Sequence, residues 1–126
     1  MEIVRAADRA RQAGPADWFT GRVELRSIAP PEALLVTFKP GARTAWHTHP
    51  CGQALHIVSG VARVGRDDGT VEELHPGDLV TFAAGERHWH GAGPDAEMAH
   101  VAIARTAADA RPADWQAHVT DIEYGA

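Results

Sequence analysis

The sequence lacks the features that mark several common classes of protein. Its single cysteine excludes an internal disulfide and fits a reducing cytoplasm. It contains no basic run, and its formal net charge of −5 argues against nucleic acid as a partner. No apolar stretch approaches the roughly 20 residues that span a bilayer, and residues 1–9 carry charge too early for a signal peptide. We therefore expect a cytoplasmic protein that binds neither nucleic acid nor membranes.

The rest of the chain reads as one domain built from strands. A length of 126 residues fits a single core. Apolar residues alternate with polar ones in short runs, as at Leu34, Val36 and Phe38, which predicts half-buried strands. Asp67-Asp68-Gly69 predicts a hairpin, because Asp-Gly supplies the positive φ of a tight turn. The predicted strands cover residues 22–26, 34–39, 47–49, 53–59, 61–66, 70–75, 79–83, 87–90 and 98–105. Their length and spacing predict an all-β sandwich or barrel.

The N-terminal 20 residues differ from this pattern. Residues 6–13 predict a short helix that ends at Gly14-Pro15. Trp18 and Phe19 are too apolar to remain in water, so we expect them to dock on the domain.

The C-terminal tail is also different. Residues 109–119 are alanine-rich and predict one or two helical turns, with Trp115 and Val119 one turn apart. The tetrapeptide Pro-Ala-Asp-Trp occurs at 15–18 and again at 112–115. Four residues are too few to establish a repeat, and we interpret the coincidence as chance.

Two histidine-bearing stretches predict a metal site. His47 and His49 point to the same face of an extended segment, because strand residues i and i+2 do so. The turn at 50–52 can bring Gln53 back toward them, and His88, or His88 together with His90, can complete the set. Three imidazoles and an amide oxygen suit a divalent first-row metal. Eight histidines with this spacing argue against a chance run on a solvated strand.

Three further residues are candidates for catalysis, each with a structural alternative. His90 lies two residues after His88 and could be a general base, or a partner of the ligands, or a surface histidine. His100 shares a predicted face with Met98 and Ala104 and could line a pocket or be a hydrogen-bonded core histidine. Thr44 could orient a substrate oxygen, although a threonine in a strand needs no functional reason.

The two stretches resemble the paired motifs of the cupin superfamily. The first motif is matched by Gly41, His47, His49 and Gly60, with Gln53 in place of the usual glutamate. The second is matched by Gly77, Gly85 and His88, whereas Ala83 and Ala92 replace a proline and an asparagine of the turns. The chain is also similar, over most of its length, to small bacterial cupins with (R)-selective hydroxynitrile lyase activity. Shared blocks include residues 14–21, 40–50, 75–78, 88–92 and 118–121.

This resemblance implies a single-domain cupin β-barrel, a double-stranded β-helix of jelly-roll type. The barrel would cover residues 21–106, with an N-terminal extension at 1–20 and a tail with a short helical segment at 107–126. It implies manganese, with Fe²⁺, Ni²⁺, Co²⁺ or Zn²⁺ as alternatives, and assembly into a homodimer or homotetramer. The implied metal ligands are His47, His49, Gln53 and His88, and the resemblance implies that Thr44, His90 and His100, our candidate catalytic residues, line the pocket. We predict that the wall of the substrate pocket consists of Leu34, Val36, Phe38, Met98 and Ala104.

Three functions fit this site. Because Gln53 is neutral, a divalent ion would keep its charge of +2 and favour anions. The first function is a metal-dependent lyase that cleaves an aromatic cyanohydrin such as (R)-mandelonitrile into aldehyde and hydrogen cyanide, with His90 as the base. The second is another metal-dependent cupin reaction, O₂-dependent oxidation or isomerisation of a small molecule. The third is a non-catalytic small-molecule sensor, which the lack of a visible effector segment disfavours.

Overall fold

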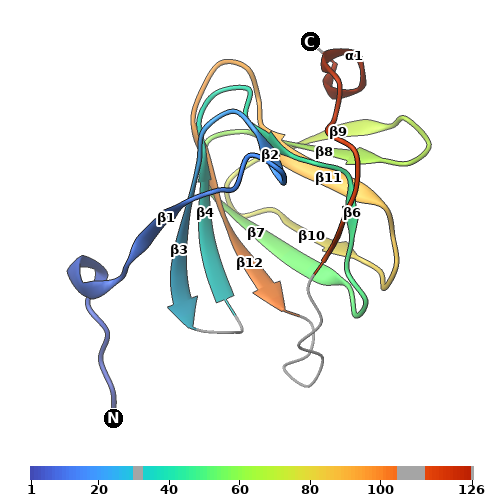
Figure 1. Cartoon of the computed structure of the whole chain (residues 1–126). Coiled ribbons are helices and arrows are strands. Elements are labelled where there is room, and N and C mark those ends of the chain that lie inside the picture. Colours follow the sequence, from blue (N-terminus) through green and yellow to red (C-terminus); the bar gives the residue numbers. More distant parts are fainter. Residues whose placement is uncertain (30–32, 105–112, 126) are drawn as a thin grey trace.

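Two antiparallel sheets face each other in the computed structural model, which describes residues 1–29, 33–104 and 113–125 (Figure 1). The elements are η1 (Ala6–Asp8), β1 (Arg11–Ala13), β2 (Phe19–Thr20), β3 (Val23–Ala29), β4 (Ala33–Phe38), β5 (Arg43–Thr44), β6 (His47–Thr48), β7 (Gln53–Ser59), β8 (Ala62–Arg66), β9 (Val71–Leu74), β10 (Leu79–Phe82), β11 (His88–Ala92), β12 (Met98–Ala104), β13 (Asp114–Trp115) and α1 (Asp121–Tyr124). The all-β prediction is therefore confirmed.

The first sheet has the order β1-β3-β4-β12-β7-β10 within the described residues. In the second sheet, β5 and β6 both pair with β11, while β8 pairs with β11 and also with β9. The segments β2 and β13 add to β5 and β6 from the two ends of the chain. The N-terminal extension and the tail therefore contribute strands to the same sheet as the histidine segment.

Alternation along the strands sets which side chains face the interior. In β7, Leu55 and Ile57 are buried, whereas His56 and Val58 are exposed. The largest apolar cluster contains Val36, Phe38, Ile57 and Met98 and lies between the two sheets. A second cluster joins Leu55, Val64 and Phe82. These two clusters form the apolar interior of the domain.

The hairpin predicted at Asp67-Asp68-Gly69 joins β8 to β9. Gly69 has a φ of 89°, the left-handed region that Asp-Gly was expected to supply. The Asp68 carboxylate accepts a hydrogen bond from the Thr70 N–H at 2.9 Å. The turn thus fixes the register of the two strands.

The predicted helix over residues 6–13 is wrong beyond its first turn. Only Ala6–Asp8 is helical, as a 3₁₀ turn with no side-chain cap and no buried residue. Arg11–Ala13 instead forms β1 and pairs with β3. A short isolated helix without an apolar face is marginal in water, so pairing with an open sheet edge prevails over alanine's helix propensity.

The helical turns predicted over 109–119 are also wrong in the part that the structure describes. Asp114–Trp115 is a strand on β6, and residues 109–112 lie outside the described ranges. The helix begins later, at Asp121, with a capping box between Thr120 and Glu123 and a left-handed Gly125 at its end. The Thr-x-x-Glu pattern of a capping box is present in the sequence, and it predicts the position of the helix better than the alanine content of residues 109–119 does. Within the described ranges, no helix has the length and apolar character needed to cross a bilayer.

Candidate metal centre

His47 and His88 form the centre of the histidine cluster. They lie directly opposite each other in the pairing of β6 with β11, so their side chains share a face. Both are buried, and their ring centroids are 4.3 Å apart. His47 Nδ1 lies 2.8 Å from the carbonyl oxygen of Ala45, and His88 Nδ1 lies 2.8 Å from that of Glu86. Because a carbonyl only accepts, each Nδ1 donates its hydrogen, which leaves Nε2 with a free lone pair.

His49 and Gln53 lie on one side of this pair. The His49 ring centroid is 4.9 Å from that of His47 and 5.6 Å from that of His88. The intervening turn uses Gly52 at a φ of 80°, and a Cβ there would collide with the Phe82 carbonyl oxygen. The turn brings the side chain of Gln53 next to that of His49. His49 and Gln53 therefore lie beside His47 and His88.

Unpartnered polar atoms mark this region as a site for an ion. Among the described residues, His49 Nε2, Gln53 Oε1 and His88 Nε2 are buried without a hydrogen-bond partner. A buried polar atom without a partner costs about 1–3 kcal/mol, so such atoms are rare and call for an explanation. Two imidazole nitrogens and an amide oxygen gathered beside His47 fit a divalent first-row metal. The residues present are therefore compatible with the metal that the resemblance implies.

His90 lies on the other side of the central pair. Nitrogens of His47, His88 and His90 all lie within 4.8 Å of one another. His90 follows His88 on the same face of β11, with ring centroids 5.9 Å apart. The geometry thus offers two ligand sets, in which His47 and His88 are joined either by His49 and Gln53 or by His90.

His90 is held from both sheets. Its Nδ1 is 3.0 Å from Nε2 of His100, which projects from β12 in the first sheet. The Phe38 ring packs against both histidines, with centroids 5.3 Å from His100 and 6.0 Å from His90. Thr44 Oγ1 accepts a hydrogen bond from the His90 N–H at 3.1 Å. His100 is therefore a hydrogen-bonded interior histidine, and Thr44 fixes the backbone at His90.

Burial makes these histidines neutral at neutral pH. It lowers the pKa of His88 to about 4 and that of His100 to about 3. Burial is also the main reason why the pKa values of His47 and His90 lie well below 6.5, reinforced by the neighbouring His88 and His100 respectively. The pKa of His49 is lowered for the same reason. A neutral imidazole is the form that binds a metal or accepts a proton.

We expect the metal-free protein to lose stability steeply in mild acid. Below pH 6.5 the unfolded chain takes up protons on histidines that remain neutral in the fold, so protonation favours unfolding. The free energy of unfolding should fall by about 1.4 kcal/mol per pH unit for each such histidine. For His88 this loss runs from about pH 6.5 down to its folded pKa of about 4. Urea unfolding at pH 7.5 and 5.5 tests this, and equal midpoints would contradict it.

The predicted pocket residues lie in three places. Phe38 contacts the histidines, whereas Val36 and Met98 are buried in the interior cluster and Leu34 packs against it. The backbone of Ala104 lies opposite Gln53 in the pairing of β12 with β7. The proximity of Ala104 to the donor set thus follows from the sheet register.

Two aromatic residues beside the site were not predicted. Phe82 stacks on His88 with centroids 3.6 Å apart and an interplanar angle of 11°. Trp115 lies over His47 at 4.5 Å. The pairing of Phe82 with Gln53 in β10 and β7 places the first, and that of Trp115 with His47 places the second. Both pairings are between segments distant in sequence, and no local signal reveals them.

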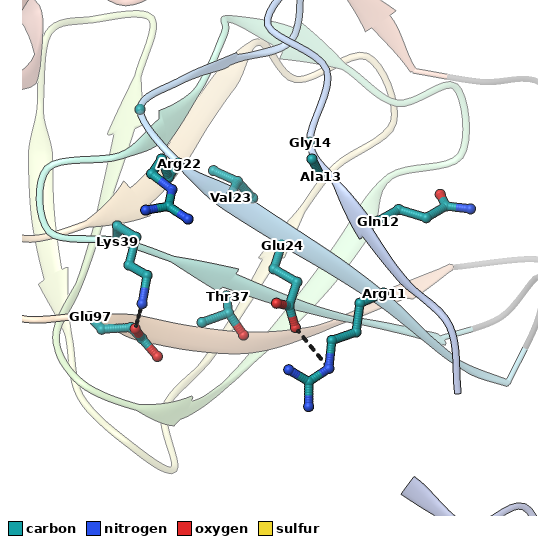
Figure 2. A pocket seen from close by; sticks show the side chains of 11 residues that line it. Arg11, Gln12, Ala13, Gly14, Arg22, Val23, Glu24, Thr37, Lys39 and Glu97 are labelled. Carbon is teal, nitrogen blue, oxygen red and sulfur yellow. Dashed lines mark hydrogen bonds and ion pairs between the residues drawn. The ribbon is translucent and has the colours of Figure 1, made fainter. Parts of the chain in front are cut away.

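A separate pocket lies on the outer side of the first sheet near β1 and β3, and it contains none of the predicted site residues (Figure 2). Ion pairs join Lys39 to Glu97 at 2.6 Å and Arg11 to Glu24 at 3.7 Å along its wall. These charged side chains are paired with one another and are exposed to solvent. The histidine cluster, rather than this pocket, is the candidate site.

Comparisons with known proteins identify the family. The sequence pattern described as the cupin domain matches residues 34–103, and the chain belongs to the cupin family. The chain is 52% identical over 130 residues to the (R)-mandelonitrile lyase of Granulicella tundricola, covering 98% of both chains. This identity across nearly the full length supports an enzyme of lyase-like class.

Solved structures agree on the fold. A cupin-like protein from Thermotoga maritima matches with a TM-score of 0.84 and 36% identity, over 89% of both chains. The polyketide cyclase RemF from Streptomyces resistomycificus matches with a TM-score of 0.77 at 19% identity, over 98% of this chain and 90% of that one. The second likeness concerns the fold alone. The prediction of a single-domain cupin barrel is confirmed.

Proposed function

We propose that the protein is a metal-dependent hydroxynitrile lyase that reversibly cleaves an aromatic cyanohydrin, such as (R)-mandelonitrile, into aldehyde and hydrogen cyanide. The observation that carries the proposal is a neutral, buried His90 beside a set of unpartnered donor atoms. A base next to a cationic centre is the arrangement that this cleavage requires. The relationship to the Granulicella enzyme supports the same substrate class.

We assign His47, His49, Gln53 and His88 as the residues that hold the metal, and manganese as the metal. None of the four carries negative charge, so the ion would keep its full charge of +2. When bound, such an ion acts as a Lewis acid and stabilises negative charge on a substrate oxygen. The same donors also suit Fe²⁺, Co²⁺, Ni²⁺ and Zn²⁺, so the metal that is bound in the cell depends on which of these ions is available there.

His90 accepts the hydroxyl proton of the cyanohydrin at Nε2. That atom is buried without a partner, while Nδ1 is engaged by His100. As the carbonyl forms, the C–C bond breaks and cyanide leaves with its electron pair. The proton on His90 then passes to cyanide and yields hydrogen cyanide. For Nε2 to accept a proton, Nδ1 of His90 must carry the hydrogen and donate it to Nε2 of His100. This hydrogen bond, together with the one from the His90 backbone N–H to Thr44 Oγ1, holds the base in place through both transfers.

The test is cleavage of (R)-mandelonitrile by the protein reconstituted with manganese, followed by benzaldehyde absorbance. We expect release well above that of free manganese and of protein stripped with a chelator. No cleavage above those two controls would overturn the lyase proposal. Parallel recording with an oxygen electrode would reveal O₂ consumption if the protein were instead an oxidising cupin.

We further propose that the chain forms a homodimer or homotetramer through the outer face of the first sheet. Leu79, His56, Val101 and Leu35 occupy successive positions across four paired strands on that face. Leu79 is 59% exposed and Val58 is 48% exposed, although neither is polar. Three of the four residues in this row are apolar, and exposed apolar side chains gathered in this way are typical of a protein interface.

The Leu79→Lys variant should form smaller assemblies than wild type in light scattering at micromolar concentration. A charge buried within an apolar interface is costly to desolvate. The control is Val71→Lys, which adds the same charge at an exposed apolar position in the second sheet. A monomeric wild type would contradict the proposal, as would equal dissociation in both variants.

A further inference from the structure

Two tryptophans from outside the matched cupin region meet beside His47. Trp115 ends β13 and lies directly opposite His47 in the pairing with β6, so both side chains share one face. The ring centroids are 4.5 Å apart and the rings are tilted by 32°. Trp18 stacks on Trp115 at 5.1 Å with an interplanar angle of 7°. Trp18, Trp115 and His47 therefore form a continuous aromatic stack.

The backbone ties the same three residues together. The Trp18 carbonyl oxygen accepts a hydrogen bond from the Ala45 N–H at 2.7 Å. The Ala45 carbonyl oxygen in turn accepts from His47 Nδ1 at 2.8 Å. Thus the backbone of Trp18 holds Ala45, and the carbonyl of Ala45 sets the tautomer of His47. The ring of Trp18 also packs against Trp115.

We infer that Trp115 is a positioning residue for His47 and that Trp18 supports it from behind. One hydrogen bond at Nδ1 fixes the tautomer but leaves the ring free to tilt. Trp115 lies near His47, and the His88 ring lies 4.3 Å away. These neighbours restrict the direction in which the His47 Nε2 lone pair points. A ligand held in its binding orientation loses less freedom when the ion arrives, which raises affinity.

The two tryptophans reach this stack from opposite ends of the chain. Each Trp closes one copy of Pro-Ala-Asp-Trp, of which Pro112 lies outside the described residues. The segment that follows Trp18 pairs with residues 43–44, just before His47, and the segment that ends at Trp115 pairs with residues 47–48. The N-terminal extension and the tail would then set the metal affinity of a ligand that the central barrel supplies.

The test measures metal affinity, and it rests on the proposed metal centre. Mn²⁺ dissociation constants of the full-length protein would be obtained by competition with a chromophoric chelator. Trp115→Ala should weaken binding by about 10–100-fold, the usual effect of losing a residue that orients a ligand. Trp115→Phe keeps an aromatic face and should bind within a few-fold of wild type. Trp18→Ala should show a smaller loss and should add nothing in the Trp115→Ala background, because it acts through Trp115.

The matched control is Trp46→Phe. Trp46 is adjacent to His47 in sequence, but it packs with Trp89, Val119 and Tyr124. Melting curves of the metal-free proteins would show that each variant is folded. If Trp115→Ala does not fold, Trp18→Ala still tests the inference, because Trp18 is 39% exposed and its loss should disturb the fold less. Unchanged affinity in folded Trp115→Ala, or an equal loss in Trp46→Phe, would overturn this inference alone. A wild type that takes up no Mn²⁺ would overturn the metal centre and this inference with it.

Discussion

The His90→Ala variant should lose at least two decades of turnover on (R)-mandelonitrile and keep its metal. A positioned general base contributes about 10²–10⁴-fold to rate, and His90 is the neutral imidazole beside the donor set that has one nitrogen unengaged. Initial rates of benzaldehyde release, with metal content measured on the same samples, check both halves of this expectation. The His75→Ala variant removes a histidine whose side chain is 60% exposed, and it should behave as wild type.

The pH dependence of cleavage offers a second measure of the same role. The base must be neutral, and burial holds the pKa of His90 well below 6.5. Activity should therefore remain level through neutral pH and fall only in acid, as His90 takes up a proton. A His90→Ala variant that cleaves as fast as wild type would place the base elsewhere, with His100 as the next candidate.

The His88→Ala variant should lose nearly all bound metal. His88 is fully buried at the centre of the cluster, its Nδ1 is fixed by Glu86, and its Nε2 has no other partner. Removing a ligand from a buried site leaves the remaining donors without full coordination. Elemental analysis after dialysis against trace chelator measures the loss.

Phe82→Leu is the matched control for this prediction. Phe82 stacks on the His88 ring, and the variant removes the stack while every donor atom remains. Like Trp115→Ala, it should bind the ion more weakly than wild type, but at saturating Mn²⁺ it should still take up about one ion per chain, whereas His88→Ala should not. Stoichiometric metal in His88→Ala would show that His88 is not a ligand, whatever its place in the cluster.

Much of the site could be predicted because its signals are local. Side chains two residues apart in a strand lie on the same face, which places His47 beside His49 and His88 beside His90. The turn at Gly52 then returns Gln53 to the cluster. The strands themselves were found by the same alternation. These inferences need no knowledge of which strands are neighbours.

The rest depended on contacts between distant segments. Phe82 and Trp115 reach the histidines through the pairing of β10 with β7 and of β13 with β6, which nothing in the flanking sequence specifies. The helix expected at 6–13 failed because an open sheet edge offered Arg11–Ala13 better hydrogen bonding. The choice between His49 and His90 as a ligand also remained open, since both flank the central pair.

Metal content of His49→Ala and His90→Ala, purified and reconstituted side by side, tests the central claim most directly. If His47, His49, Gln53 and His88 hold the ion and His90 is the base, His49→Ala should lose most of its metal and His90→Ala should keep about one ion per chain. The reverse result, with metal retained in His49→Ala and lost in His90→Ala, would show that His47, His88 and His90 form the binding triad and would contradict the account.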